Sequence, residues 1–233
     1  MGDFMSRKEV VERFDEIAES YDESVTVKSP WYERLIRRMV ELADPKESDT
    51  VLDMGAGTGN VTFAFAPRVR KVVALDISEK MLRVCMKKAK EKGFQNVEVR
   101  YGDFENPNYD GKVDIIATSI AFHHLTHEQK RRAIIGWYDL LNPGGRVVIG
   151  DMMFFFDPVQ ERERALQIIT FLLERFAVKK GGEDLKAAME RYRKTDHPIY
   201  VNTLKSYFEE AGYTVTAIEE IAPPILGIIC AKK

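Results

Sequence analysis

The sequence predicts an α/β domain built on a doubly wound, mostly parallel sheet of seven strands, of which the last is antiparallel. Between residues 50 and 150, short apolar runs alternate with amphipathic segments of helical length. The first apolar run leads into closely spaced glycines, and the next two runs are followed by aspartates. With 233 residues, 45% of them hydrophobic, the chain is expected to form one domain over residues 1–233.

Two helices are predicted before the sheet, and residues 1–45 are expected to form a helical lid. Apolar residues between Arg7 and Tyr21 recur at helical spacing. A second helix is expected after Ser29, because serine is a favoured N-cap residue and Pro30 is tolerated in the first helical turn.

Residues 46–153 form the predicted core, in which strands and helices alternate. A continuous apolar run is typical of a strand that helices cover on both faces. The turn Asn142-Pro143-Gly144-Gly145 is expected just before the fifth strand. The expected parallel strands are Val51–Met54, Val72–Leu75, Val97–Tyr101, Val113–Thr118 and Arg146–Gly150.

After the fifth strand the alternation stops, and residues 154–200 are predicted to be a helical insertion that caps the substrate. A long helix is expected to open at Asp157, and a shorter one is expected around Leu185–Tyr192. Residues 201–233 are expected to hold a helix and two antiparallel strands joined at Pro223-Pro224, namely Thr203–Ala211, Thr214–Ile221 and Ile225–Ala231.

Charge and composition narrow the choice of partner and compartment. The formal net charge is −2, whereas a dedicated DNA-binding protein is usually basic, so no DNA is expected. Cys85 and Cys230 are too few for a disulfide framework or a cysteine metal site. The apolar runs are too short to span a bilayer, and no basic, apolar leader begins the chain. We therefore expect a cytoplasmic protein, monomeric or homodimeric, with no metal and no membrane insertion.

The glycine-rich segment after the first strand indicates a bound ligand. Gly55, Gly57 and Gly59 allow a sharp turn and let a ligand approach the backbone without a Cβ in the way. A dinucleotide site requires glycine where this chain has Asn60. Asp53 would also repel a pyrophosphate, whereas it would favour a cationic ligand. A nicotinamide dehydrogenase is therefore a weaker interpretation.

Two further aspartates follow neighbouring strands. The carboxyl end of a strand in an open parallel sheet faces the ligand crevice, so Asp76 is expected to accept ribose hydroxyls. Its alternative role is to cap the next helix together with Ser78. Asp103 could accept the adenine amino group beside the Phe104 ring, or it could be an ordinary turn aspartate.

These segments together resemble the class I S-adenosylmethionine (SAM)-dependent methyltransferases. The resemblance covers roughly residues 10–150 and rests on five segments in the expected order, namely Phe14–Asp22, Val51–Gly59, Val73–Ser78, Gly102–Phe104 and Leu141–Gly145. The opening helix with Tyr21 is similar to the lid of the ubiquinone/menaquinone-biosynthesis-like branch. The fold implied is Rossmann-like, with SAM as cofactor and S-adenosyl-L-homocysteine as product.

The resemblance also implies which residues bind the cofactor. The glycine segment would hold the methionine part of SAM, Asp76 the ribose and Asp103 the adenine. Ser119 and Ile120 would lie under the methyl donor. The full set of expected cofactor residues is Tyr21, Asp53, Gly55, Ala56, Gly57, Thr58, Gly59, Asp76, Ile77, Met81, Asp103, Phe104, Ser119 and Ile120.

Two histidines follow the fourth strand and are the catalytic candidates. His123 or His124 could remove a proton from the acceptor, because an imidazole titrates near neutral pH. The alternative is that one of them packs or caps the loop before Thr126. A substrate pocket is predicted from these two histidines together with apolar side chains that could equally be core, namely Trp31, Met152 and Phe154.

The sequence thus predicts an enzyme that transfers the SAM methyl group by in-line displacement to a small-molecule acceptor. Whether the nucleophile is O, N, S or C stays open at this point. A tRNA- or protein-directed methyltransferase and a non-catalytic SAM-binding module remain alternatives.

Overall fold

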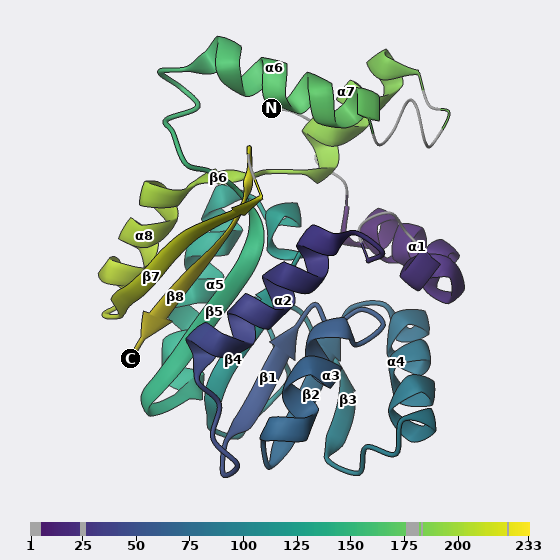
Figure 1. Cartoon of the computed structure of the whole chain (residues 1–233), viewed down its shortest axis with the longest axis vertical. Helices are drawn as coiled ribbons and strands as arrows, with labels where there is room; N and C mark the ends of the chain where they lie inside the picture. The colour runs from purple at the N-terminus through teal and green to yellow at the C-terminus, as the bar shows by residue number, and fades with distance from the viewer. Residues whose placement is uncertain (1–5, 24–26, 176–181, 183, 223) are drawn as a thin grey trace.

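The computed structural model describes residues 6–23, 27–175, 182, 184–222 and 224–233. A single twisted sheet forms its centre, and helices cover both faces (Figure 1). The strands pair in the order β3-β2-β1-β4-β5-β8-β7. They span Thr50–Met54 (β1), Lys71–Asp76 (β2), Val97–Tyr101 (β3), Val113–Ser119 (β4), Leu141–Phe154 (β5), Thr214–Ala222 (β7) and Leu226–Lys232 (β8).

The predicted sheet is confirmed, including which of its strands run parallel and which run antiparallel. Strands β1 to β5 are parallel, and β8 runs antiparallel to both β5 and β7. The sequence did not predict β6, which is only two residues long, Ile199–Tyr200, and pairs with β5 beyond the main sheet. Because β1 to β4 are parallel, their carboxyl ends meet at one edge, which is where a ligand is expected.

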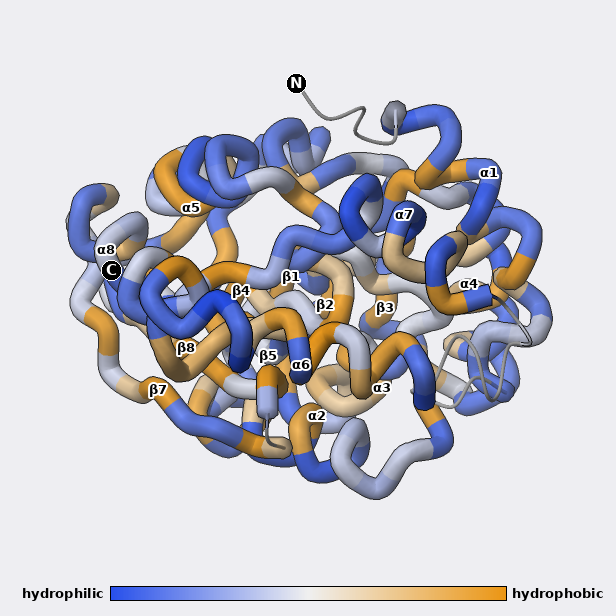
Figure 2. Tube along the Cα trace, turned by 90° about the horizontal axis from the view of Figure 1, so that it is seen from above, coloured by the Kyte–Doolittle hydropathy of each residue, from blue (hydrophilic) through white to orange (hydrophobic). Residues whose placement is uncertain are grey.

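The core has a layer on each side of the sheet. On one face, α2 (Pro30–Ala43) and α3 (Asn60–Phe65) contribute the buried Leu35, Met39 and Phe65. On the other face, α5 (His127–Leu140) and α8 (Val201–Glu210) contribute Trp137 and Phe208. Figure 2 shows hydrophobic residues gathered along the central strands and hydrophilic ones along the outer helices. The two apolar layers hold the sheet between the helices, so the ends of β1 to β4 are positioned by the packed core.

Helix starts follow the capping residues in the sequence. In α1 (Arg7–Ile17), Ser6 and Glu9 form a capping box, and Thr126 with Gln129 does the same for α5. The Ser78 side chain caps α4 (Glu79–Glu91) by accepting a hydrogen bond from the Met81 N–H. A short 3₁₀ segment, η1 (Ala18–Glu23), continues α1.

The fifth strand is longer than predicted. Its pairing with β4 shifts register between Val113, opposite Leu141, and Ile115, opposite Arg146. The predicted turn Asn142–Gly145 therefore lies inside β5, where Gly144 has a φ of 78°. At its other end β5 continues to Phe154 instead of stopping at Gly150.

The insertion differs in its helix boundaries. Helix α6 spans Arg162–Leu173 and not the longer range that Asp157 was expected to open. The Asp157 carboxylate accepts the backbone N–H of Val159 at 2.9 Å, which favours a turn there instead of a helix. Helix α7 spans Leu185–Thr195, with Asp184 as its cap. Between the two helices, Gly182 has a φ of 69°, a conformation that suits glycine.

Helices α6 and α7 lie beyond the carboxyl ends of the strands, and α1 lies at the same end of the molecule beside α4 (Figure 1). The segment after α7 returns to the sheet, because the His197 N–H donates to the His123 carbonyl at 2.8 Å. Within the described part of the chain, no helix is long and apolar enough to cross a membrane.

Candidate cofactor and acceptor site

The glycine segment makes a backbone turn that brings it close to two neighbouring loops. Gly55, Gly57 and Gly59 have φ values of 71°, 53° and 94°, a region that other residues rarely adopt. A Cβ at Gly55 would lie 2.8 Å from the Ala121 Cβ and 3.0 Å from the Phe104 ring. A side chain at residue 55 would therefore both strain the turn and collide with its neighbours.

Asp76 connects the end of β2 to this turn. One carboxylate oxygen, Oδ2, accepts the Gly57 N–H at 2.8 Å, and Oδ1 accepts the Ser78 N–H at 2.8 Å. Burial raises the pKa of Asp76, although these N–H donors act in the opposite direction. Asp76 thus stabilises the turn before α4 and also lines the cavity described below.

Asp103 and Phe104 follow β3 at the same edge. Asp103 Oδ1 accepts the backbone N–H groups of Glu105 at 2.9 Å and Asn106 at 2.6 Å, as a turn aspartate does. Its other oxygen pairs with the Arg7 guanidinium at 2.7 Å. The Phe104 ring packs edge-on against Phe122, with 5.5 Å between centroids.

A cavity of about 320 Å³ lies where β1 to β4 end, within the range of small-ligand sites. Its walls come from the glycine turn, from the loops after β2, β3 and β4, and from the N-terminal helix. The expected cofactor residues that line it are Tyr21, Gly55, Ala56, Gly57, Asp76, Ile77, Met81, Asp103, Phe104, Ser119 and Ile120.

Three expected cofactor residues lie behind the cavity wall. Asp53 is buried below the turn, and its Oδ2 accepts the Thr62 hydroxyl at 2.5 Å. Thr58 is buried, does not line the cavity, and donates its hydroxyl hydrogen to Asp22 Oδ1. A Cβ at Gly59 would face Cys85 and Phe63 at 2.7 Å, so Gly59 faces the α4 side and not the ligand side. The structure thus places these three residues where they shape the turn.

Burial raises the pKa of Asp53 to about 7. Its Oδ1 atom has no hydrogen-bond partner among the described residues. Burial therefore disfavours the charged form of Asp53, and its carboxylate does not line the cavity as the sequence suggested.

The N-terminal segment is fastened across the site by polar contacts. Asp22 Oδ1 accepts the Thr58 hydroxyl at 2.6 Å, and its Oδ2 pairs with Lys88 at 2.6 Å. Asp15 accepts the Ser78 hydroxyl at 2.5 Å. Between them, Tyr21 lines the cavity, and burial raises its pKa to about 12. Sequence reasoning chose Tyr21 and missed Asp22, although both belong to the segment on which the family resemblance rests.

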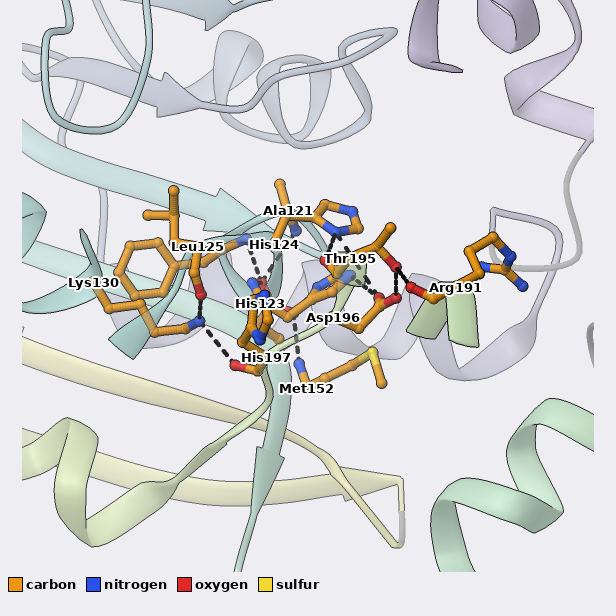
Figure 3. Close-up of polar contacts among 12 residues, drawn as sticks. Ala121, His123, His124, Leu125, Lys130, Met152, Arg191, Thr195, Asp196 and His197 are labelled. Carbon is orange, nitrogen blue, oxygen red and sulfur yellow. Dashed lines mark hydrogen bonds and ion pairs between the residues drawn. The ribbon is translucent and has the colours of Figure 1, made fainter. Parts of the chain in front are cut away.

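A buried polar cluster lies beside the cavity, where η3 (Phe122–His124) meets the end of α7 (Figure 3). His123 Nδ1 lies 2.6 Å from Asp151 Oδ1, and its Nε2 lies 3.2 Å from Asp196 Oδ1. Burial disfavours the charged imidazole, but the two carboxylates outweigh burial and raise the pKa of His123 to about 9. His123 is thus an imidazolium with both nitrogens occupied, and it does not line the cavity.

Asp151 was not predicted, and it organises this cluster. Its Oδ2 accepts the consecutive backbone N–H groups of Ala121 at 3.1 Å, Phe122 at 2.7 Å and His123 at 3.2 Å. It therefore fixes the loop after β4 that carries both histidines. An acidic residue at the end of an apolar strand, Gly150-Asp151, was the available signal.

His124 does line the cavity. Its Nδ1 lies 2.8 Å from the Thr195 carbonyl and 3.9 Å from Asp196 Oδ1 (Figure 3). Its ring packs edge-on against Phe14 of α1, with centroids 5.5 Å apart. Burial and the neighbouring positive charge of His123 lower the pKa of His124 to about 4. One atom from each of His123, His124 and Asp196 that could ligate a metal lies within 4.8 Å of the others.

The remaining expected substrate residues do not line the cavity. Phe154 is buried in a separate cluster with Phe156 under α6, and Met152 packs against the same cluster. Trp31 packs edge-on against Tyr32, with centroids 5.9 Å apart, on the α2 side of the sheet. The reason is that β5 runs four residues past Gly150, so Met152 and Phe154 belong to a strand and not to a loop over the crevice.

A doubly wound sheet with a glycine turn and acidic strand ends around one cavity defines a nucleoside-binding enzyme class. Residues 51–145 match the family model described as a methyltransferase domain. An uncharacterized methyltransferase from Oceanobacillus iheyensis is 30% identical over 230 residues, covering 97% of this chain and 98% of that protein. One from Geobacillus kaustophilus is 31% identical over 219 residues, covering 92% and 94%.

Solved structures agree on the fold. The [4+2]-cyclase SpnF superposes with a TM-score of 0.74 at 13% identity, covering 99% of this chain and 98% of that one. The N-methyltransferase NodS from Bradyrhizobium japonicum, solved with S-adenosyl-L-homocysteine, gives 0.69 at 14% identity, covering 95% and 97%. The chain therefore belongs to the methyltransferase family, and its fold is that of the class I SAM-dependent members.

Proposed function

We propose that this protein transfers the methyl group of SAM to a small-molecule acceptor. The observation that supports this most strongly is the cavity at the ends of β1 to β4, which combines a bare backbone turn with acidic side chains. Three carboxylates line it, those of Asp76, Asp103 and Glu105.

The charge of the cavity favours SAM over a dinucleotide. SAM carries a sulfonium and an ammonium group, which carboxylates attract, whereas a pyrophosphate would be repelled. Arg7 is the lining residue with a fixed positive charge, and it already pairs with Asp103. NodS was solved with the SAM product, and the structural neighbour DhpI was solved with SAM.

The sequence expectations give a consistent pose for the cofactor. In this proposal Asp76 accepts the ribose hydroxyls, since a carboxylate that already accepts two N–H groups retains further lone pairs. Phe104 stacks beside the adenine, and Asp103 accepts its amino group. The backbone of Gly55–Gly57 approaches the methionine part, with Tyr21 over it. The hydrogen bond from Thr58 of the glycine turn to Asp22, next to Tyr21 in the N-terminal segment, also supports the ubiquinone/menaquinone-biosynthesis-like branch.

The chemistry asked of the protein is mainly alignment. As the acceptor atom bonds to the methyl carbon, the carbon–sulfur bond breaks and its electron pair stays on sulfur, which becomes a neutral thioether. Holding the two reactants in line can contribute about 7–11 kcal/mol at best. The rigid strand ends and the N-terminal segment that covers them provide such alignment.

A small acceptor is favoured because the N-terminal helix forms part of the cavity wall. Val10, Phe14 and Tyr21 line the cavity together with the glycine turn. A tRNA-directed or protein-directed enzyme would need an open surface beside the cavity, with basic residues in the case of tRNA. Arg7, the basic residue that lines the cavity, is instead paired with Asp103.

Isothermal titration with SAM, followed by incubation with methyl-labelled SAM and a metabolite extract, tests the proposal. SAM binding with label transfer to one or more metabolites and release of S-adenosyl-L-homocysteine would support it. Binding without release would indicate a SAM-binding module, and transfer only to tRNA or protein would indicate the macromolecular alternative.

A further inference from the structure

The tautomer of His124 follows from its backbone partner. A carbonyl oxygen only accepts hydrogen bonds, so the 2.8 Å contact with Thr195 requires the proton on Nδ1. In the neutral ring the other nitrogen, Nε2, then carries a lone pair. No hydrogen bond to Nε2 occurs within the described part of the chain, and His124 lines the cavity. Nε2 is therefore the polar atom that His124 can offer to a bound molecule.

Charged groups surround this ring from several elements. His123 lies beside it in η3, with 4.0 Å between ring centroids, and Asp196 follows α7. Arg13 on α1 adds a further positive charge that disfavours protonation of His124. Asp151 and Asp196 hold His123 as the imidazolium, so a proton in this cluster is already on His123. Burial and the positive charges of His123 and Arg13 therefore keep His124 neutral, although Asp196 acts in the opposite direction.

We propose that His124 is the general base of the reaction through Nε2, and that the acceptor presents a neutral hydroxyl group to the cavity. This inference rests on the proposed methyl transfer and narrows its substrate class. The acidic lining disfavours an anionic acceptor such as a carboxylate or thiolate, because Arg7 is already paired with Asp103. A neutral hydroxyl must lose its proton during transfer, and a neutral imidazole can take it.

In the proposed transfer one bond to the methyl carbon forms while another breaks. The hydroxyl oxygen bonds to the methyl carbon, and the carbon–sulfur pair returns to sulfur. The hydroxyl proton moves to Nε2 of His124, giving a methyl ether, S-adenosyl-L-homocysteine and an imidazolium that returns its proton to water. An oxygen that is forming a second bond to carbon becomes strongly acidic, so even a weakly basic imidazole accepts this proton. Asp196, 3.9 Å from Nδ1, would stabilise the transient charge.

Long-range ¹H–¹⁵N NMR of the histidine rings tests the assignment without turnover. In the wild-type protein without added ligand, His124 should be the neutral Nδ1–H tautomer from pH 6 to pH 8, while His123 should stay protonated. A protonated His124 at pH 7, or the Nε2–H tautomer, would overturn the proposal. Zn²⁺ added alone should leave both rings unchanged, and a stoichiometric shift of both would instead assign the cluster to a metal.

Turnover gives the second readout, with 2-naphthol, 2-naphthoic acid and 2-naphthalenethiol as matched probe acceptors. Methyl transfer should be selective for the hydroxyl compound. His124→Gln should lower it by about 10²–10⁴-fold while SAM affinity stays within a few fold. His127→Gln, which removes a histidine outside the cavity, is the matched control. Equal turnover in His124→Gln and wild type, or selectivity for the acid or the thiol, would contradict the proposal. Failure of SAM to bind would instead reject the proposed function, because the NMR result does not depend on it.

Discussion

Thr58 in the glycine turn donates its hydroxyl hydrogen to Asp22 Oδ1 at 2.6 Å. The other oxygen of Asp22 pairs with Lys88 of α4 at 2.6 Å. The Asp22 carboxylate in η1 thus links the N-terminal segment both to the glycine turn of the cavity wall and to α4, which packs on the sheet. The cavity wall is therefore completed by the N-terminal segment, which is not part of the sheet and is held in place by these side-chain contacts.

We predict that Asp22→Asn weakens SAM binding by about 3–30-fold. Charge-assisted hydrogen bonds contribute about 1.5–3 kcal/mol, and partial exposure of Asp22 reduces that figure. The variant should also be cleaved faster within α1 by a protease, because its segment is held less firmly. Isothermal titration and limited proteolysis provide the two measurements.

Glu19→Gln is the matched control, since Glu19 is an exposed acid on the same 3₁₀ segment. It should bind SAM as the wild type does. Equal losses in both variants would show that general charge, and not the contact with Thr58, controls the affinity.

Asp53 gives a prediction about pH. Its pKa is about 7 in the folded protein against 3.8 in the unfolded chain, so the folded state holds a proton that the unfolded state releases. Between these two values, ionisation makes Asp53 progressively unfavourable to folding as pH rises. In thermal melts, the melting temperature of Asp53→Asn minus that of the wild type should therefore increase from pH 4 to pH 8.

The comparison cancels other titrating groups, because both proteins share them. Asp139→Asn, at an exposed acid on α5, should run parallel to the wild type over the same range. If the melting temperature of Asp53→Asn also changes with pH in parallel with that of the wild type, Asp53 is ionised throughout this range. Burial then does not raise its pKa.

Asp151→Asn is predicted to lower the free energy of unfolding by about 3–5 kcal/mol. The change leaves the His123 imidazolium without its nearest buried counter-charge, and removal of one partner from a buried pair has that typical cost. Chemical denaturation at pH 7 measures it. A loss below about 1 kcal/mol would mean that His123 is neutral in the wild type, since an uncharged ring needs no such partner.

The sequence predicted the site well where the functional residues and the backbone turn that positions them are adjacent in the chain. Gly55, Gly57 and Asp76 were predicted because strand ends, glycines and carboxylates are adjacent in the chain, and all three line the cavity. The parallel direction of the first five strands followed from the alternation of strands and helices, since parallel strands require crossover connections. Capping at Ser78 and Thr126 was equally local.

Contacts between distant segments were not predictable in the same way. Asp151 and Asp196 reach His123 from β5 and from the end of α7, and nothing in their neighbourhood in the chain indicates that contact. Met152 and Phe154 were misplaced because an apolar run shows that a segment is buried but not against what. His124 could be separated from His123 only once the Thr195 carbonyl was located.

The central claim is that Asp76 and the glycine turn form the SAM site, and titration of SAM into wild type and Asp76→Ala tests it most directly. We predict that wild type binds SAM and not NAD⁺. The variant should lose more than about 100-fold in SAM affinity, since two hydrogen bonds to a charged group contribute about 3 kcal/mol or more. Its circular dichroism spectrum should stay unchanged. Equal SAM affinity in both proteins would contradict the account.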